Sequence, residues 1–155
     1  MSLPPLVYYS DESKYRDHYK RVYCRGCIVS FDGIRIYFQP QRFEHAFYEG
    51  VGKSRFSPVR AQRIDWIKAT LEHPEANLYQ GWNKRKKIYE PHRRVSVVYE
   101  DFVVVVELAL TRCGALKGKF VTCYQADNSI SKIRCSPPWS VEACLQALRG
   151  ERIGR

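Results

Sequence analysis

The sequence predicts an α+β protein in which N-terminal helices pack on a mainly antiparallel, twisted sheet. Its centre is the stretch 93–125, where runs rich in Val, Phe and Tyr are separated by Glu100-Asp101 and by the segment 114–118. Such runs, broken by short turn segments, are typical of antiparallel strands. Apolar residues at helical spacing dominate the region before them, so we expect helices on one face of the sheet. A chain of 155 residues, 45% of them apolar, is long enough for one domain with a proper core.

We interpret residues 1–155 as a single domain in three parts. Residues 1–39 are expected to form a helix over 11–22 and a hairpin over 27–38. An Asp-Gly pair at 32–33 stands between two alternating apolar runs there, and such pairs favour the primed hairpin turns. Residues 40–125 are expected to form the central α+β core, and residues 126–155 an edge strand followed by a C-terminal helix.

Two helices are expected between residues 40 and 71. The first begins near Pro40, includes His45 in the stretch FEHAFYEG, and ends at the glycines 50 and 52. The second begins at Ser57-Pro58, because a side-chain acceptor followed by proline is a strong helix start. Its inward stripe consists of Val59, Ile64, Ile67 and Leu71.

Strands are expected to follow these helices from residue 77 onward. Residues 77–81 and 87–90 are expected as two short strands joined by a basic turn, and the central strands follow. Strict alternation along the last of these places Phe120, Thr122 and Tyr124 on one face, with Val121 and Cys123 on the other. We expect residues 128–135 to form a further edge strand, and Ser140 to cap a helix that runs to about residue 148.

The chain is strongly basic, and the excess charge is uneven. The formal net charge is +10 at pH 7, and the sequence pI is about 9.4. Residues 51–94 hold eleven Lys and Arg against four Asp and Glu, a surplus of seven positive charges. Such a surface favours a polyanionic partner, nucleic acid first, although a solvated face without a partner remains the alternative.

Neither a membrane span nor a signal peptide is visible in the sequence. The longest apolar run, 102–106, is far shorter than the about 20 residues that cross a bilayer. The N-terminus lacks a basic segment followed by an apolar one. We therefore expect a cytoplasmic protein with no membrane partner.

The six cysteines are expected to stay reduced, because no secretion signal accompanies them. Cys24 and Cys27 have the spacing of half a zinc site, but no second close pair follows. A complete site would need remote ligands such as Cys113, Cys135 or His18. We expect no metal and no cofactor, with Cys24 and Cys27 as the alternative. Cys123 and Cys144 fall on apolar positions and are expected in the core.

The residue types favour phosphodiester chemistry without a metal ion. The sequence has no phosphate-binding glycine loop, no HExxH motif and no nucleophile elbow, and its carboxylates do not cluster as in a two-metal nuclease. RNA supplies its own nucleophile, the 2′-hydroxyl, so a protein needs only a base, an acid and cations around the phosphate. His45 is the leading acid or base candidate, although a histidine between aromatic residues can equally belong to the core. The other three histidines are expected to be exposed.

Arginine and aromatic residues supply candidate binding groups. Arg60 and Arg63 lie one helical turn apart, so both can project toward one phosphate, unless they simply form an exposed helix face. Thr122 and Tyr124 could orient a phosphate or a proton from the sheet, or be ordinary strand residues. We expect the further nucleic-acid-binding residues to come from a flexible basic loop and the rings that interleave with it: Tyr79, Trp82, Lys84, Arg85, Lys86, Lys87, Tyr89 and His92.

The order of these elements resembles a known group of enzymes. A histidine-bearing helix precedes a helix of the form RxxRxxWIxxTL that ends in HP. A strand pair containing tyrosine, two valine-rich strands and a closing FVTCY strand follow. Over residues 45–124 this pattern resembles the barnase–EndoU–colicin–RelE (BECR) group of metal-independent ribonucleases, especially members associated with phages and mobile elements.

The resemblance implies an RelE-like sheet cupped against N-terminal helices, an RNA substrate, and often a toxin role restrained by an inhibitor protein. It implies catalytic roles for His45, Arg60, Tyr89, Thr122 and Tyr124, and products with a 2′,3′-cyclic phosphate. Some members use a second histidine or lysine, for which Lys87 and His92 are the candidates here. Two other functions stay open: a non-catalytic RNA- or DNA-binding module, and a basic interaction protein for an acidic partner.

Overall fold

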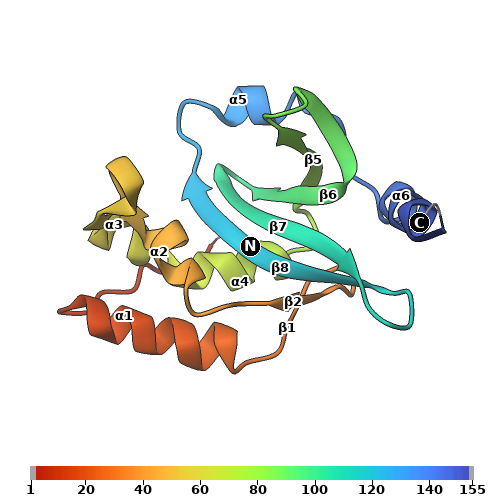
Figure 1. Cartoon of the computed structure of the whole chain (residues 1–155). Coiled ribbons are helices and arrows are strands. Elements are labelled where there is room, and N and C mark those ends of the chain that lie inside the picture. Colours follow the sequence, from red (N-terminus) through yellow and green to blue (C-terminus); the bar gives the residue numbers. More distant parts are fainter. Residues whose placement is uncertain (1–2, 154–155) are drawn as a thin grey trace.

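The computed structural model describes residues 3–153 of the chain, and it has the predicted α+β class (Figure 1). Six strands form one mixed sheet in the order β1-β2-β8-β7-β6-β5. These strands are β1 Ile28–Val29, β2 Arg35–Tyr37, β5 Asn77–Asn83, β6 Ile88–Tyr99, β7 Phe102–Leu110 and β8 Leu116–Gln125. A separate small ribbon consists of β3 Tyr48–Glu49 and β4 Arg55–Phe56. The helices are α1 Glu12–Tyr19, α2 Arg42–Phe47, α3 Pro58–Ala61, α4 Ile64–Glu72, α5 Ile130–Ile133 and α6 Val141–Ile153.

The predicted antiparallel meander is confirmed, and it runs from β5 to β8. The two short runs expected around residues 87–99 form one long strand, β6. Its pairing with β5 is interrupted, since Gln80 pairs with Val95 and the next residue, Gly81, pairs with Glu90. Residues 91–94 therefore form a bulge without pairing partners in β5. A side chain on Gly81 would bring its Cβ within 2.7 Å of the Cβ of Arg94, so only glycine allows this close approach.

The N-terminal hairpin of β1 and β2 is confirmed, but its place in the sheet was not predicted. Strand β2 pairs in parallel with β8, and Arg35 lies opposite Lys117. The two strands approach closely because Gly118 has no side chain. A Cβ there would lie 2.5 Å from Val106 Cγ1 and 2.7 Å from Ile36 Cδ1.

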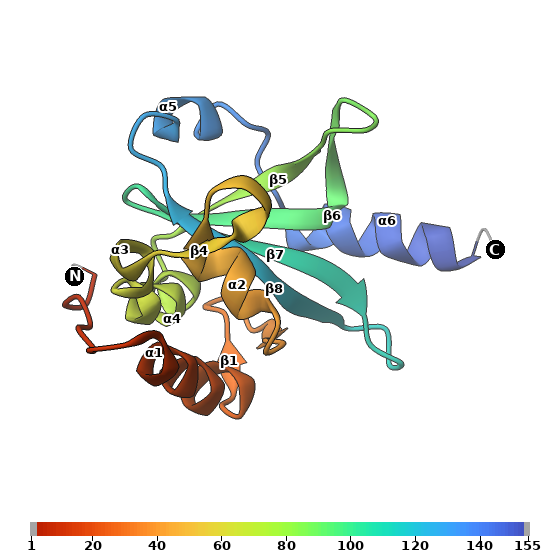
Figure 2. The same ribbon diagram turned by 60° about the vertical axis from the view of Figure 1, so that its left-hand side comes forward.

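Helices cover one face of the sheet and leave much of the other face open. Helix α2 lies on β8, and α4 lies on β6 and β7 (Figures 1 and 2). Helix α1 continues into a π-helical turn, Lys20–Cys24. The core between helices and sheet is rich in rings, all almost fully buried: Tyr15, Tyr19, Tyr23, Phe38, Phe43, Phe47 and Phe120.

The helix expected over residues 57–71 is divided into α3 and α4. Its start is as predicted, because Ser57 Oγ accepts the backbone N–H of Arg60 at 3.2 Å. Ile64, Ile67 and Leu71 are fully buried, as expected, but Val59 is 61% exposed. The chain leaves helical geometry between Ala61 and Ile64, so α3 and α4 no longer share one stripe.

The predicted alternation along β8 is wrong for Phe120. Val105 pairs with Thr122 and Val106 pairs with Phe120, so Val121 is an extra residue in the strand. This bulge moves Phe120 into the main core beside the helices. Tyr124 packs instead in a small second cluster, with Val98 and Val103, on the other face. One inserted residue is enough to exchange the faces of a strand.

The expected edge strand at 128–135 is wrong as well. This segment contains the short helix α5, and both Ile130 and Ile133 pack against the second cluster. Two apolar residues three positions apart share one side of a helical turn, whereas in a strand they would point to opposite faces. The cap of the final helix is confirmed, since Ser140 Oγ accepts the N–H of Ala143 at 3.2 Å.

Candidate functional site

Helix α2 holds His45 at the surface. Phe43, Ala46 and Phe47 are buried, while His45 points away from them and is exposed. The hydroxyl of Thr122 on β8 donates a hydrogen bond to the backbone oxygen of His45 at 2.9 Å. Thr122 therefore fixes the position of α2 on the sheet, and its hydroxyl is already engaged. The alternative in which His45 is a buried core residue among aromatic side chains is therefore wrong.

Arg60 and Arg63 approach the same site from α3 and the break that follows it. Arg60 Nη1 donates to the backbone oxygen of Ala46 on α2 at 3.4 Å. Arg63 donates to the backbone oxygen of Val59, and its guanidinium carbon lies 5.1 Å from the centre of the Trp66 ring. The helix break thus keeps both arginines on one side of the molecule.

Both arginines line a hollow of about 360 Å³, which we call the arginine hollow. Its other polar lining comes from Glu49, Ser57, Cys123, Tyr124, Gln125 and Asp127. Burial raises the pKa of the Tyr124 hydroxyl above its usual value and that of the Cys123 thiol to about 12. Both groups are therefore protonated at neutral pH, and Tyr124 can donate a hydrogen bond there. One of the two carboxylates, Glu49, is paired with Arg55 at 3.4 Å.

Tyr124 also lines a second hollow, on the open face of the sheet. This sheet groove has a volume of about 520 Å³, and its main lining residues are Trp82, Tyr89, Arg94, Tyr124, Lys132 and Ser136. The rings of Trp82 and Tyr89 meet edge to face, with centres 4.9 Å apart. The hydroxyl of Ser136 donates to the Tyr89 hydroxyl at 3.3 Å. The structure therefore places Tyr89 in the sheet groove and not in the arginine hollow.

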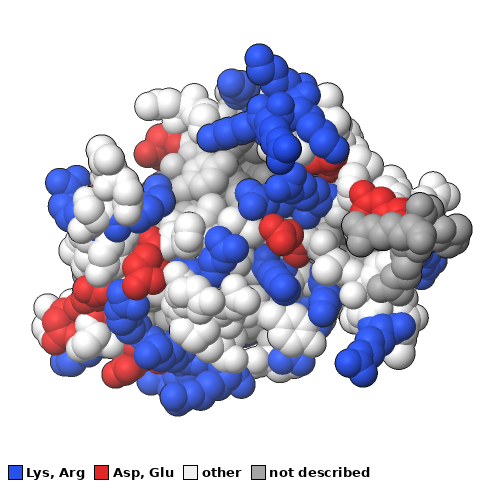
Figure 3. Space-filling model, viewed as in Figure 1, with Lys and Arg blue, Asp and Glu red and all other residues white. Residues whose placement is uncertain are grey.

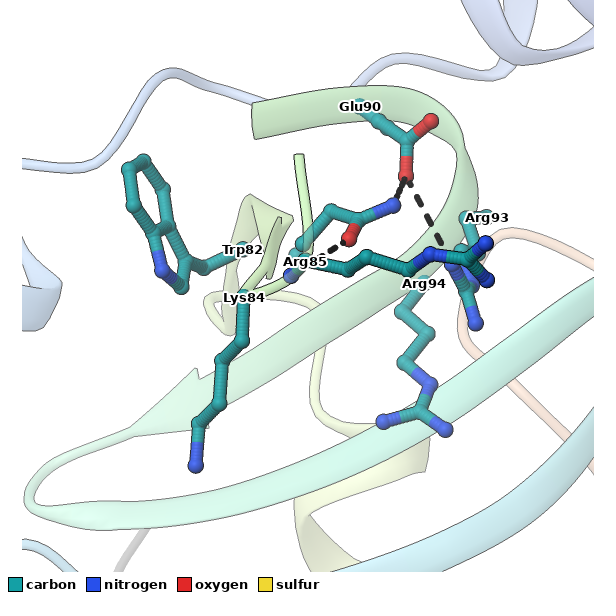
Figure 4. A pocket seen from close by; sticks show the side chains of 8 residues that line it. Trp82, Lys84, Arg85, Glu90, Arg93 and Arg94 are labelled. Atoms are coloured by element: carbon teal, nitrogen blue, oxygen red, sulfur yellow. Dashed lines mark hydrogen bonds and ion pairs between the residues drawn. The ribbon is translucent and has the colours of Figure 1, made fainter. Parts of the chain in front are cut away.

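The basic turn, Lys84–Lys87, is a hydrogen-bonded turn between β5 and β6. Asn83 Oδ1 accepts the backbone N–H groups of Arg85 and Lys86 at 3.0 and 3.1 Å, and Asn83 Nδ2 donates to Glu90 Oε1 at 2.6 Å (Figure 4). Lys86 and Arg93 also approach the carboxylate of Glu90, at 3.8 and 3.9 Å. The hydrogen bond from Asn83, followed by these charges, lowers the pKa of Glu90.

The basic turn borders a third hollow of about 390 Å³ that shares Gly81, Trp82 and Arg94 with the sheet groove. Figure 4 shows Lys84 and Arg94 extending away from the buried Asn83–Glu90 pair. In Figure 3 the Lys and Arg side chains gather over the tip of the β5–β6 hairpin and continue onto the strands below it. The hairpin tip and the open face thus form one basic surface.

The other histidines do not reach these hollows. His18 and His73 are each only 8% exposed, so the prediction that they lie at the surface is wrong. His18 is held between the Tyr9 hydroxyl and Asp65 Oδ1, both at 2.8 Å. His92 is half-buried and pairs through Nε2 with Glu151 on α6 at 2.9 Å. Neither His92 nor Lys87 lines the arginine hollow, so neither supplies it with a second acid or base.

Three lining residues of the sheet groove and its neighbour were missed by sequence reasoning: Arg93, Arg94 and Lys132. The first two belonged to the predicted basic surplus, but only the bulge at 91–94 brings them to the hollows. Lys132 was missed because it lies in residues 128–135, which were expected as an edge strand and form α5 instead. Tyr79, which was expected to bind nucleic acid, packs in the second apolar cluster and lines none of the three hollows.

The cysteines form no evident metal centre. Cys24 is half-buried and burial raises its thiol pKa, whereas Cys27 is exposed. Within residues 3–153, no three His, Cys, Asp or Glu side chains lie close enough together to hold a metal ion. Cys123 and Cys144 are buried, as predicted.

Two further questions concern membrane-spanning helices and similarity to known proteins. Across the described part of the chain, none of the helices has the length and apolar character required to cross a bilayer. Comparison with protein-family models, with curated proteins and with solved structures finds no match to this chain.

Proposed function

We propose that this protein is a metal-independent endoribonuclease that cleaves RNA by attack of the substrate's own 2′-hydroxyl. One observation carries the proposal. Arg60, Arg63 and Tyr124, from two separate regions of the chain, line one hollow, and Ala46 in that lining is the direct neighbour of the exposed His45. Phosphodiester transfer in RNA requires a base, an acid and cations around the phosphate, and a histidine, a protonated phenol and two guanidiniums can fill these roles.

In this proposal His45 takes the proton of the 2′-hydroxyl as its oxygen attacks phosphorus. The bond from phosphorus to the 5′-oxygen breaks, and that oxygen leaves with a proton from an acid, for which Tyr124 is the candidate. The products are a 2′,3′-cyclic phosphate and a 5′-hydroxyl. Arg60 and Arg63 bind the phosphoryl oxygens and stabilise the negative charge that develops on them. Thr122 acts by holding α2, and hence His45, on the sheet.

The test is incubation of the purified protein with end-labelled RNA in EDTA, beside DNA of the same sequence. We expect cleavage of the RNA only, with cyclic-phosphate ends. His45→Ala should lower the cleavage rate by about 10²–10⁴-fold, the usual contribution of a general acid or base. Binding of a non-cleavable 2′-deoxy strand should be unchanged by that substitution. Equal cleavage of DNA, or activity of His45→Ala like that of the wild type, would refute the mechanism.

A matched control addresses the arginines. Arg60→Ala should reduce cleavage strongly, whereas Arg21→Ala removes an equal charge from the exposed surface of the π-helical turn, away from the hollows. If both substitutions reduce cleavage equally, general charge attraction explains the effect and the arginine hollow has no special role.

A non-catalytic RNA-binding module is the second candidate. It is favoured by the position of Trp82, Tyr89 and the basic turn, which are spread over surfaces that do not include His45. Within residues 3–153 the imidazole of His45 has no hydrogen bond that would orient it. RNA binding without cleavage in the same assay would support this candidate.

A toxin role, restraint by an inhibitor protein and a cytoplasmic location belong to the same proposal. An inhibitor with acidic side chains would cover the basic surface of Figure 3 and compete with RNA. Loss of cleavage on adding such a protein, reversed by salt, would support this partner.

A further inference from the structure

The sheet groove and the arginine hollow are two hollows that share one lining residue. Tyr124 is in the lining of both, so the two hollows adjoin at this residue. The two volumes, about 360 and about 520 Å³, each lie in the range of about 300–1,000 Å³ that is typical of small-ligand sites. A chain-like ligand bound in the first hollow would therefore enter the second as it continues.

The walls of the sheet groove are suited to flat rings. Trp82 is 50% exposed although it is a large aromatic residue, and its ring meets that of Tyr89 edge to face. Half of the Trp82 surface is thus open to a ligand. Stacking on an exposed aromatic face is how proteins bind the bases of single strands without reading their sequence.

The charges around the groove favour an anionic chain. Arg94 and Lys132 lie in its lining, and Lys84, Arg85 and Arg93 continue the positive surface into the adjoining hollow. The nearby carboxylates are already paired. Glu107 lies 3.6 Å from Arg94, and Glu90 lies 3.8 Å from Lys86 and 3.9 Å from Arg93. The groove therefore combines ring faces with phosphate-binding side chains.

We infer that the sheet groove binds unpaired nucleotides next to the cleaved bond, so that the substrate is single-stranded RNA longer than a dinucleotide. This inference rests on the proposed function for the position of the cleaved bond. In a double helix both faces of each base are covered by its neighbours, so no base can stack on Trp82. Short substrates would occupy the arginine hollow alone and gain nothing from the groove.

The experiment compares three RNA substrates that share one cleavable step: a single-stranded oligonucleotide, the same strand annealed to its complement, and a dinucleotide. Trp82→Ala should lower kcat/KM on the single strand by about fivefold to 150-fold, the range expected for one base stacked on a ring. Cleavage of the dinucleotide should be unchanged. Trp82→Phe should retain most of the activity, and Tyr8→Ala, which removes another exposed ring, should have no effect.

The outcomes separate this inference from the proposed function. Cleavage that is unaffected by Trp82→Ala, or as fast on the duplex as on the single strand, overturns the inference and leaves the ribonuclease proposal intact. An equal fall in kcat/KM on the dinucleotide also overturns the inference, because the substitution would then act by disturbing the protein structure and not by removing a stacked base. If wild-type protein cuts no RNA but binds a single 2′-deoxy strand more tightly than Trp82→Ala does, the ribonuclease proposal fails and the groove remains a single-strand site.

Discussion

Replacing Asn83 by alanine tests whether the order of the basic turn depends on one buried amide. The side chain is only 7% exposed and makes three hydrogen bonds, one to the carboxylate of Glu90 and two to backbone N–H groups of the turn. A hydrogen bond to a charged group contributes about 1.5–3 kcal/mol, and the two backbone N–H groups can turn to water at a smaller cost. We expect Asn83→Ala to lower the free energy of unfolding by about 2–4 kcal/mol.

Urea denaturation and calorimetry measure this loss. At about 2–4 °C per kcal/mol for a protein of this size, the midpoint temperature should fall by about 5–15 °C. The control is Asn128→Ala, an exposed asparagine, which should stay within about 0.5 kcal/mol of the wild type. In a Glu90→Gln background the loss should be smaller, because the group left without its partner is then uncharged. A loss for Asn83→Ala below about 0.5 kcal/mol would refute the reasoning.

Three further outcomes are expected. Replacing Lys84 and Arg85 by alanine should make the slope of log affinity for single-stranded RNA against log salt less steep, by about 0.7 for each phosphate that the protein no longer neutralises. Replacing two exposed lysines of the N-terminal helical segment, Lys14 and Lys20, should leave this slope unchanged. Gly118→Ala should cost about 1–3 kcal/mol of stability, because its Cβ would lie within 2.7 Å of two buried side chains, while Gly150→Ala on α6 meets open space and should not destabilise. The lowered pKa of Glu90 contributes stability above its usual value of 4.5 that is lost as the pH falls below it, so acid titration of wild type should show a loss of unfolding free energy that Glu90→Gln lacks.

Local patterns in the sequence were enough to predict the elements that depend on local chemistry. Ser57-Pro58 starts a helix because a hydroxyl acceptor and a fixed φ act within one turn, and the valine-rich runs pair as neighbours because short turns join them. Arg60 and Arg63 line one hollow although the helix between 57 and 71 is broken, since Arg60 lies in α3 and Arg63 in the break directly after it.

The wrong predictions concern strand faces and burial that depend on a single inserted residue or on contacts with another segment of the chain. The bulge at Val121 exchanges the faces of β8, and alternation read from composition cannot reveal an inserted residue. The burial of His18 depends on Asp65, which belongs to a helix far along the chain. The sheet groove also depends on an irregular pairing, because the bulge at 91–94 follows from the register shift between β5 and β6. Such registers are set by the whole sheet and not by the strand alone.

The parallel pairing of β2 with β8 has a consequence for how the chain folds. Arg35 and its partner Lys117 are separated by more than half of the sequence, so the sheet cannot close until β8 has been synthesised. Until then the β1–β2 hairpin presents an unpaired edge on which other chains can add. Pairing between such distant segments slows folding, since a long loop must close before it forms. We expect refolding yield to fall with protein concentration, and a chaperone that shields strand edges to restore it.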